Sequence, residues 1–88
     1  MMNQNLEREK LIMILKKQPK FTVRIKNSQG EEREYFNINI GLENNKLELF
    51  GLFDLDVSQC SFDFYGEGRH LCTIYPENSD YVWIKIYM

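Results

Sequence analysis

The chain has 88 residues, of which 43% are hydrophobic, 14% aromatic and 27% charged, and its net charge is −2. A chain of this length can bury one hydrophobic core, and the composition excludes a mainly disordered chain. The acidic sequence pI of about 5.4 makes nucleic acid an unlikely partner, although residues 1–26 carry an excess of basic side chains.

Residues 5–18 carry the pattern of an amphipathic helix, because apolar side chains recur there at helical spacing. Pro19 disfavours helical geometry at the preceding residue, so we expect the helix to end near residue 18. The expected apolar face consists of Leu6, Leu11, Met13, Ile14 and Leu15.

After Pro19 the apolar residues alternate, which indicates strands. Two strands are predicted at residues 20–28 and 33–41, and a turn ending at Gly30 joins them into a hairpin. On the second strand Phe36, Ile38 and Ile40 alternate with Tyr35, Asn37 and Asn39, so we expect the first three to share one face. Residues 41–45 are predicted to form the next turn.

Residues 46–57 predict one long strand, because the apolar residues from Leu47 to Val57 mostly fall on odd positions. Gly51 is in phase with them, and we expect the strand to bend there. Three further strands are predicted at residues 60–65, 69–75 and 80–87. A turn at residues 66–68 and another at residues 76–80 separate them.

These elements predict an α+β fold in a single domain, residues 1–88. Consecutive strands joined by tight turns should pair antiparallel, giving a five- to six-stranded, mostly antiparallel sheet. We expect this sheet to be strongly bent, with the N-terminal helix packed on it or plugging one end of a small barrel.

Cys60, His70 and Cys72, with Asp63 nearby, are the residue types of nucleophilic catalysis. The spacing of His70 and Cys72 predicts that both side chains point to one face of a strand, whereas catalytic groups more often lie on loops. We expect two reduced, apolar thiols and a half-exposed histidine, and no enzyme. The spacing matches no zinc motif, so neither a metal nor a cofactor is expected.

Residues 43–67 carry six acidic side chains and a single basic one, Lys46. Such a surface can dock on a basic partner, including a protein that itself binds nucleic acid, because complementary fields raise association rates and specificity. The expected acidic contacts are Glu48, Asp54, Asp56 and Asp63.

The last predicted strand carries a different kind of side chain on each of its two faces. Val82, Ile84, Ile86 and Met88 share an aliphatic face that predicts core, whereas the opposite face carries large aromatic side chains and a cation. Exposed Trp and Tyr mark interfaces. The expected contacts on this face are Tyr81, Trp83, Lys85 and Tyr87.

These features predict a small non-catalytic binding protein that blocks a partner protein as an inhibitor or accessory factor. The lack of alanine and the many Asn, Lys and Ile residues suit an AT-rich phage, mobile element or low-GC bacterium. One alternative is self-assembly, such as a homodimer, through the last strand at a sheet edge. Another is stacking of single-stranded nucleic acid on Tyr81, Trp83 and Tyr87.

The longest apolar run, residues 11–15, is too short for a membrane span, which needs roughly 20 apolar residues. No signal peptide is expected either. Together these features predict a cytoplasmic protein without membrane contact.

Overall fold

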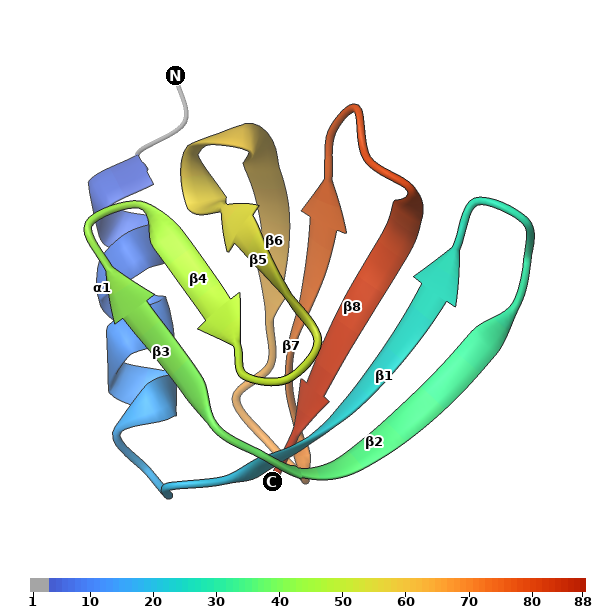
Figure 1. The fold of residues 1–88 in the computed structure, drawn as a ribbon. Helices are drawn as coiled ribbons and strands as arrows, with labels where there is room; N and C mark the ends of the chain where they lie inside the picture. Colours follow the sequence, from blue (N-terminus) through green and yellow to red (C-terminus); the bar gives the residue numbers. More distant parts are fainter. Residues whose placement is uncertain (1–3) are drawn as a thin grey trace.

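The computed structural model describes residues 4–88 and contains one α-helix, one short 3₁₀ helix and eight strands (Figure 1). In chain order they are α1 (Gln4–Leu15), β1 (Phe21–Asn27), β2 (Glu32–Ile38), β3 (Ile40–Glu43), β4 (Lys46–Leu49), β5 (Phe53–Asp56), η1 (Val57–Gln59), β6 (Cys60–Phe64), β7 (His70–Pro76) and β8 (Tyr81–Tyr87).

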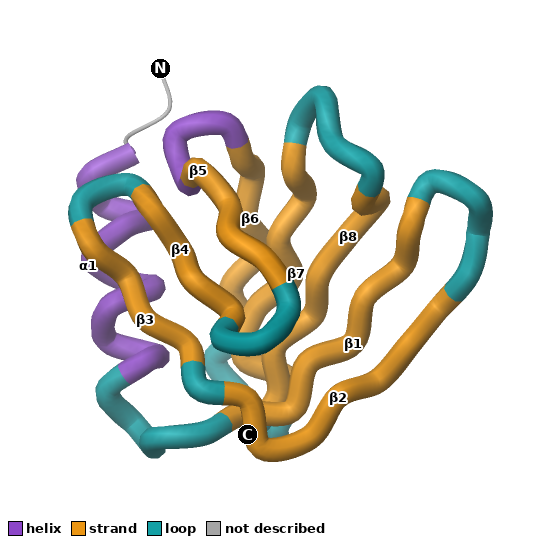
Figure 2. Tube along the Cα trace, viewed as in Figure 1, coloured by secondary structure: helices purple, strands orange, loops and turns teal. Residues whose placement is uncertain are grey.

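The strands form two antiparallel sheets whose inner faces share one core (Figure 2). The five-stranded sheet has the order β2-β1-β8-β7-β6, and the three-stranded sheet has the order β3-β4-β5. The α+β prediction is confirmed, but two sheets replace the single strongly bent sheet. The most buried core residues are Leu11, Phe21, Val23, Leu47, Leu49, Cys72, Ile74, Ile84 and Ile86.

Helix α1 covers the side of the core between β3 and β6. Leu11 and Ile14 are buried in the core, and Lys10 Nζ lies 5.5 Å from the centroid of the Phe64 ring on β6. The helix ends at Leu15, three residues earlier than predicted, and Met13 is 68% exposed, so the apolar face is narrower than expected. No helix within residues 4–88 is long and apolar enough to cross a membrane.

The predicted single strand at residues 46–57 is wrong, because the chain folds back there into the β4–β5 hairpin. Leu47 pairs with Leu55 and Leu49 with Phe53 across the two strands. Gly51 has a backbone φ of +85, a conformation that residues with a side chain rarely adopt. The Leu52 N–H donates a hydrogen bond to the Leu49 carbonyl at 2.9 Å, which closes the turn. A tight turn keeps the same odd positions facing inward, so alternation alone could not distinguish it from a bent strand.

The predicted strand at residues 33–41 is divided between the two sheets. β2 ends at Ile38 and β3 begins at Ile40, after Asn37 adopts φ 58, a left-handed conformation that Asn tolerates better than most residues. β3 continues to Glu43, so the next turn comprises only Asn44 and Asn45 rather than residues 41–45. Elsewhere the predicted strands agree with β1, β6, β7 and β8 to within a residue or two.

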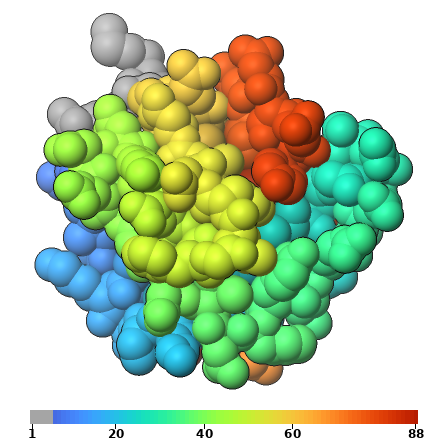
Figure 3. All heavy atoms as spheres, viewed as in Figure 1, coloured from blue at the N-terminus to red at the C-terminus, as the bar shows by residue number. Residues whose placement is uncertain are grey.

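The C-terminal strand β8 is the central strand of the larger sheet, paired with β1 on one side and β7 on the other. The expectation that it lies at an edge is therefore wrong. The edges of this sheet are β2 and β6. Figure 3 shows the other layer, in which residues of β3, β4 and β5 cover the near face of the molecule.

The substitution Gly51→Ala should destabilise the protein by about 1–2 kcal/mol, because alanine must then adopt a left-handed conformation. No heavy atom lies within 4 Å of the added Cβ, so a steric clash does not contribute. Urea unfolding followed by circular dichroism measures the loss. Gly66→Ala is the matched control, since Gly66 has open space and no positive φ, and it should leave stability unchanged. An equal loss of stability in both variants would contradict the left-handed conformation of Gly51 in the β4–β5 turn.

Candidate functional site

The outer face of the five-stranded sheet is the side that points away from the core, and no other element within residues 4–88 covers it. Cross-strand pairing places Arg24 of β1 opposite Lys85 of β8, Lys85 opposite Thr73 of β7, and Thr73 opposite Asp63 of β6. The aromatic residues on this outer face are Phe36, Tyr65, His70, Tyr75, Trp83 and Tyr87.

An extra residue in β8 decides which of its side chains lie on the outer face. Lys26 pairs with Trp83, but the next residue of β1, Asn27, pairs with Tyr81, so Val82 is bulged outward and is 45% exposed. Tyr81 turns to the inner side, where its ring stacks on Phe53 with centroids 4.3 Å apart. The predicted shared face is therefore right for Trp83, Lys85 and Tyr87 and wrong for Tyr81 and Val82.

A second irregularity brings Phe36 to the outer face. The β1–β2 register shifts between the pairs Phe21–Ile38 and Val23–Tyr35, so Tyr35 and Ile38 both face the core. Phe36 is consequently 65% exposed and lines a shallow outer hollow with His70 and Tyr87. Strict alternation predicted that Phe36 and Ile38 share one face, because it does not allow for an inserted residue.

Trp83 and Lys85 form the centre of the outer face. Lys85 Nζ lies 4.3 Å from the centroid of the Trp83 ring, a cation–π contact between neighbours on one side of the strand. Both side chains are partly buried. The contact keeps a cation and a large apolar ring together in one exposed patch.

His70 is the centre of a second aromatic group. Its ring lies 4.5 Å from that of Tyr87 and 4.4 Å from that of Tyr65, between centroids, and Nε2 is 3.0 Å from Thr73 Oγ1. Thr73 is only 1% exposed beneath these rings. Burial lowers the pKa of His70, as does the charge of Lys85, while a hydrogen bond with the Cys72 carbonyl opposes the shift. At neutral pH the imidazole is therefore uncharged and extends the aromatic surface.

The Cys–His arrangement required for nucleophilic catalysis is not formed. The register of β7 shifts between His70 and Cys72, so His70 lies outside while Cys72 is fully buried in the core. The predicted shared face is wrong. Burial raises the pKa of Cys72 to about 12 and, with help from Asp56 and Glu77, that of Cys60 to about 11. Thiols of this kind are poor nucleophiles.

The predicted acidic contacts are divided between opposite sides of the molecule. Glu48, Asp54 and Asp56 lie on the outer face of the three-stranded sheet, around a hollow of about 520 Å³ that also includes Lys46. Lys46 Nζ is 3.4 Å from Asp54 and 3.6 Å from Glu48, so part of this charge is neutralised internally. Asp63 instead lies on the aromatic outer face, where it accepts a hydrogen bond from the Tyr75 hydroxyl at 3.1 Å.

No group of three or more His, Cys, Asp or Glu side chains within residues 4–88 is placed to hold a metal ion. Asp56 already has a structural role, because its carboxylate accepts the Ser58 N–H at 3.0 Å and caps η1. The outer face of the three-stranded sheet thus presents charged side chains, and that of the five-stranded sheet presents aromatic and charged ones.

The pKa of His70 should lie below its ordinary value of 6.5 in the folded protein. Because the unfolded chain then binds the proton more tightly, the free energy of unfolding should fall as the pH drops through 6.5. NMR titration is unambiguous, since the chain has one histidine. The chain in urea is the control and should titrate near 6.5. A pKa of His70 above 6.5 in the folded protein would contradict its burial between Tyr65 and Tyr87.

Both thiols should react slowly with a disulfide reagent at pH 8 while the protein is folded, because burial keeps them protonated and inaccessible. Addition of urea should release two equivalents of reactive thiol per chain, measured by absorbance. Fast labelling of one cysteine in the native protein would show that its side chain reaches solvent.

No family model matches the chain, and no curated protein or solved structure is significantly similar to it. Function is therefore inferred from the geometry of residues 4–88.

Proposed function

We propose that the protein is a non-catalytic binding protein that docks on a partner protein through the outer face of its five-stranded sheet. The supporting observation is the aromatic surface that this face carries without a covering element in the described chain. Trp, Tyr, Phe and Arg are the residues enriched at the centres of protein interfaces.

The charges on this outer face favour a protein partner over a nucleic acid. Both basic and acidic side chains lie on this face, and Arg24 forms an ion pair with Glu32 at 3.3 Å. A phosphate backbone requires a surplus of basic groups, whereas mixed charges give a protein partner its register and specificity. The basic residues are Arg24, Lys26, Arg69 and Lys85, and the acidic residues are Glu32, Glu34 and Asp63.

A single flat partner cannot contact all the predicted residues, because Glu48, Asp54 and Asp56 lie on the far side of the core from Trp83 and Tyr87. We therefore assign the partner contact to Asp63, Trp83, Lys85 and Tyr87, and not to Glu48, Asp54 or Asp56. Small size and acidic character support an inhibitor or accessory factor in the cytoplasm of a low-GC bacterium or of a phage or mobile element that it hosts.

Self-assembly through an edge strand has weaker support. β8 is central, and the open edge strand β2 carries Glu32, Arg33 and Glu34. Charged side chains along an edge oppose pairing with another copy.

Single-stranded nucleic acid is the second candidate ligand, because a cation lies directly beside the largest ring of the outer face. Tyr81 would take no part, since it stacks on Phe53 inside the molecule.

The substitution Trp83→Ala should abolish capture of the partner from nuclease-treated lysate of the source organism, read by mass spectrometry. A central aromatic contact contributes at least about 2 kcal/mol, or about thirtyfold in affinity. The matched control carries Glu48→Gln and Asp54→Asn on the opposite face and should capture the partner as the unchanged chain does. Circular dichroism verifies that both variants are folded.

The reverse pattern, with capture lost only in the acidic-face variant, would move the interface to the three-stranded sheet. Capture that disappears after nuclease treatment, with salt-sensitive quenching of Trp83 fluorescence by oligonucleotides, would support the nucleic-acid candidate instead.

A further inference from the structure

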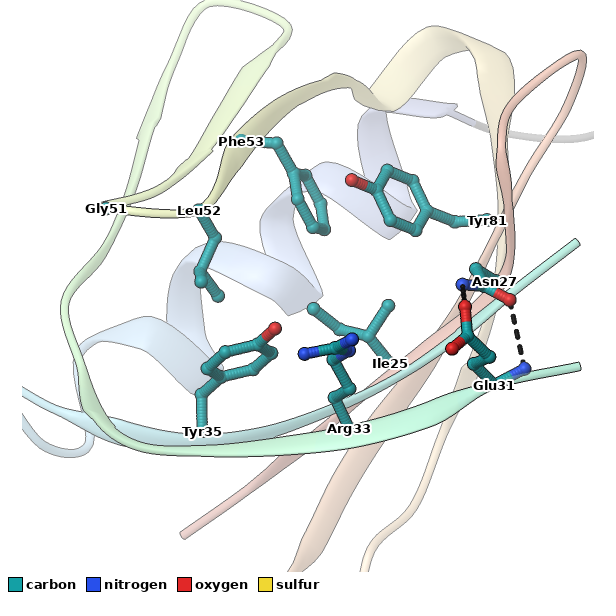
Figure 4. A pocket seen from close by; sticks show the side chains of 9 residues that line it. All are labelled: Ile25, Asn27, Glu31, Arg33, Tyr35, Gly51, Leu52, Phe53 and Tyr81. Atoms are coloured by element: carbon teal, nitrogen blue, oxygen red, sulfur yellow. Dashed lines mark hydrogen bonds between the residues drawn. The ribbon is translucent and has the colours of Figure 1, made fainter. Parts of the chain in front are cut away.

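On the side away from α1 the two sheets enclose a cavity of about 290 Å³ (Figure 4). The β1–β2 hairpin forms one wall, and the turn between β4 and β5 forms the other, with Tyr81 of β8 beside it. None of the predicted partner contacts other than Tyr81 lines this cavity. It is therefore a separate feature from the aromatic outer face.

One part of the cavity is apolar and flat. The rings of Phe53 and Tyr81 stack with an interplanar angle of 23°, and Leu52 and Ile25 complete this surface. These side chains belong to the margin of the core and are only partly buried, except Ile25. An aromatic or other planar group can therefore cover them and remove further apolar surface from water.

Arg33 supplies the charge of the cavity. It pairs across the strands with Ile25, so it lies on the core side of an edge strand, and Figure 4 shows its guanidinium pointing to the centre. The side chain of Arg33 makes no hydrogen bond or ion pair with any residue in 4–88. The hydroxyl group of Tyr35 points into the same space (Figure 4).

The acidic residue that lines the cavity, Glu31, is hydrogen-bonded to Asn27 and not to Arg33. Its carboxylate accepts a hydrogen bond from Asn27 Nδ2 at 3.0 Å, while Asn27 Oδ1 accepts the N–H groups of Glu31 and Gln29. This network closes the β1–β2 turn and draws Glu31 to the rim (Figure 4). The guanidinium in the centre is thus without a counterion among the described residues.

We propose that this cavity binds a small monocarboxylate with a planar apolar body. The guanidinium of Arg33 takes the carboxylate through paired hydrogen bonds, Tyr35 donates a further one, and the body lies against Phe53 and Tyr81. The volume is about twice the roughly 150 Å³ cavity that accommodates benzene, which suits one or two fused rings bearing an acid group.

The charges exclude two other classes of ligand. Aromatic walls with Glu31 nearby would suit an organic cation, but Arg33 occupies the centre and repels it. Glu31 at the rim would repel a dianionic phosphate about twice as strongly as a monocarboxylate, and Arg33 carries only one compensating charge.

Phenylacetate is the probe, and ¹H–¹⁵N NMR titration of the full chain is the measurement. Shift changes should be confined to residues around Arg33, Phe53 and Tyr81. The neutral isostere phenylacetamide should bind about tenfold more weakly or worse, because the charge-assisted hydrogen bonds are lost. Benzyltrimethylammonium should not bind.

Arg33→Gln should weaken phenylacetate binding by about tenfold or more. Arg24→Gln is the matched control, because it removes the same charge from the neighbouring strand but on the outer face, and it should bind as the unchanged chain does. Glu31→Gln should bind as tightly or more tightly. Trp83→Ala should also leave phenylacetate binding intact, which separates this cavity from the partner interface.

Two results would overturn the proposal. One is the absence of shift changes in the cavity at millimolar phenylacetate. The other is self-association of the Arg33→Gln variant without any effect on phenylacetate binding, which would show that Arg33 serves only to protect the edge strand.

Discussion

The structure depends on the packing of two sheets of unequal width across one hydrophobic core. Ile74, Ile84 and Ile86 of the larger sheet lie against Leu47 and Leu49 of the smaller sheet. Three strands cannot cover five, so part of the larger sheet's inner face needs another cover. Helix α1 provides it beside β6 with Leu11 and Ile14, while the side beside β2 stays partly open. The cavity is a direct result of this mismatch.

The same packing turns one face of the larger sheet to the core and leaves the other face without a covering element in residues 4–88. A free face in an antiparallel sheet is ordinarily polar. Here it carries rings from four strands or their ends, ordered by the cation–π contact at Trp83 and by the stack around His70. These contacts hold the rings in place, which would reduce the entropy lost when the proposed partner binds.

Three inserted residues control which side chains reach which face. The irregularities near Asn37, Leu71 and Val82 each reverse the alternation of a strand. They place Phe36 and His70 outside, and they turn Tyr81 inward to the cavity. Bulges of this kind re-aim single side chains without changing the fold, so the outer face and the cavity can be altered independently of the core.

The sequence by itself determined the α+β class, the N-terminal helix, the β1–β2 hairpin and the central aliphatic pair Ile84 and Ile86, because these follow from local periodicity. It also identified Trp83, Lys85 and Tyr87 as one face. Only the tertiary structure decided that residues 46–57 form a hairpin, that β8 is central, and that the acidic and aromatic residues lie on opposite sides. It also brought Arg33 to Phe53 and Tyr81. Strand order, bulges and long-range contacts depend on how the faces of the sheets pack across the core. The two-residue alternation of apolar and polar side chains is the same whichever strand lies next to it, so it cannot reveal the strand order.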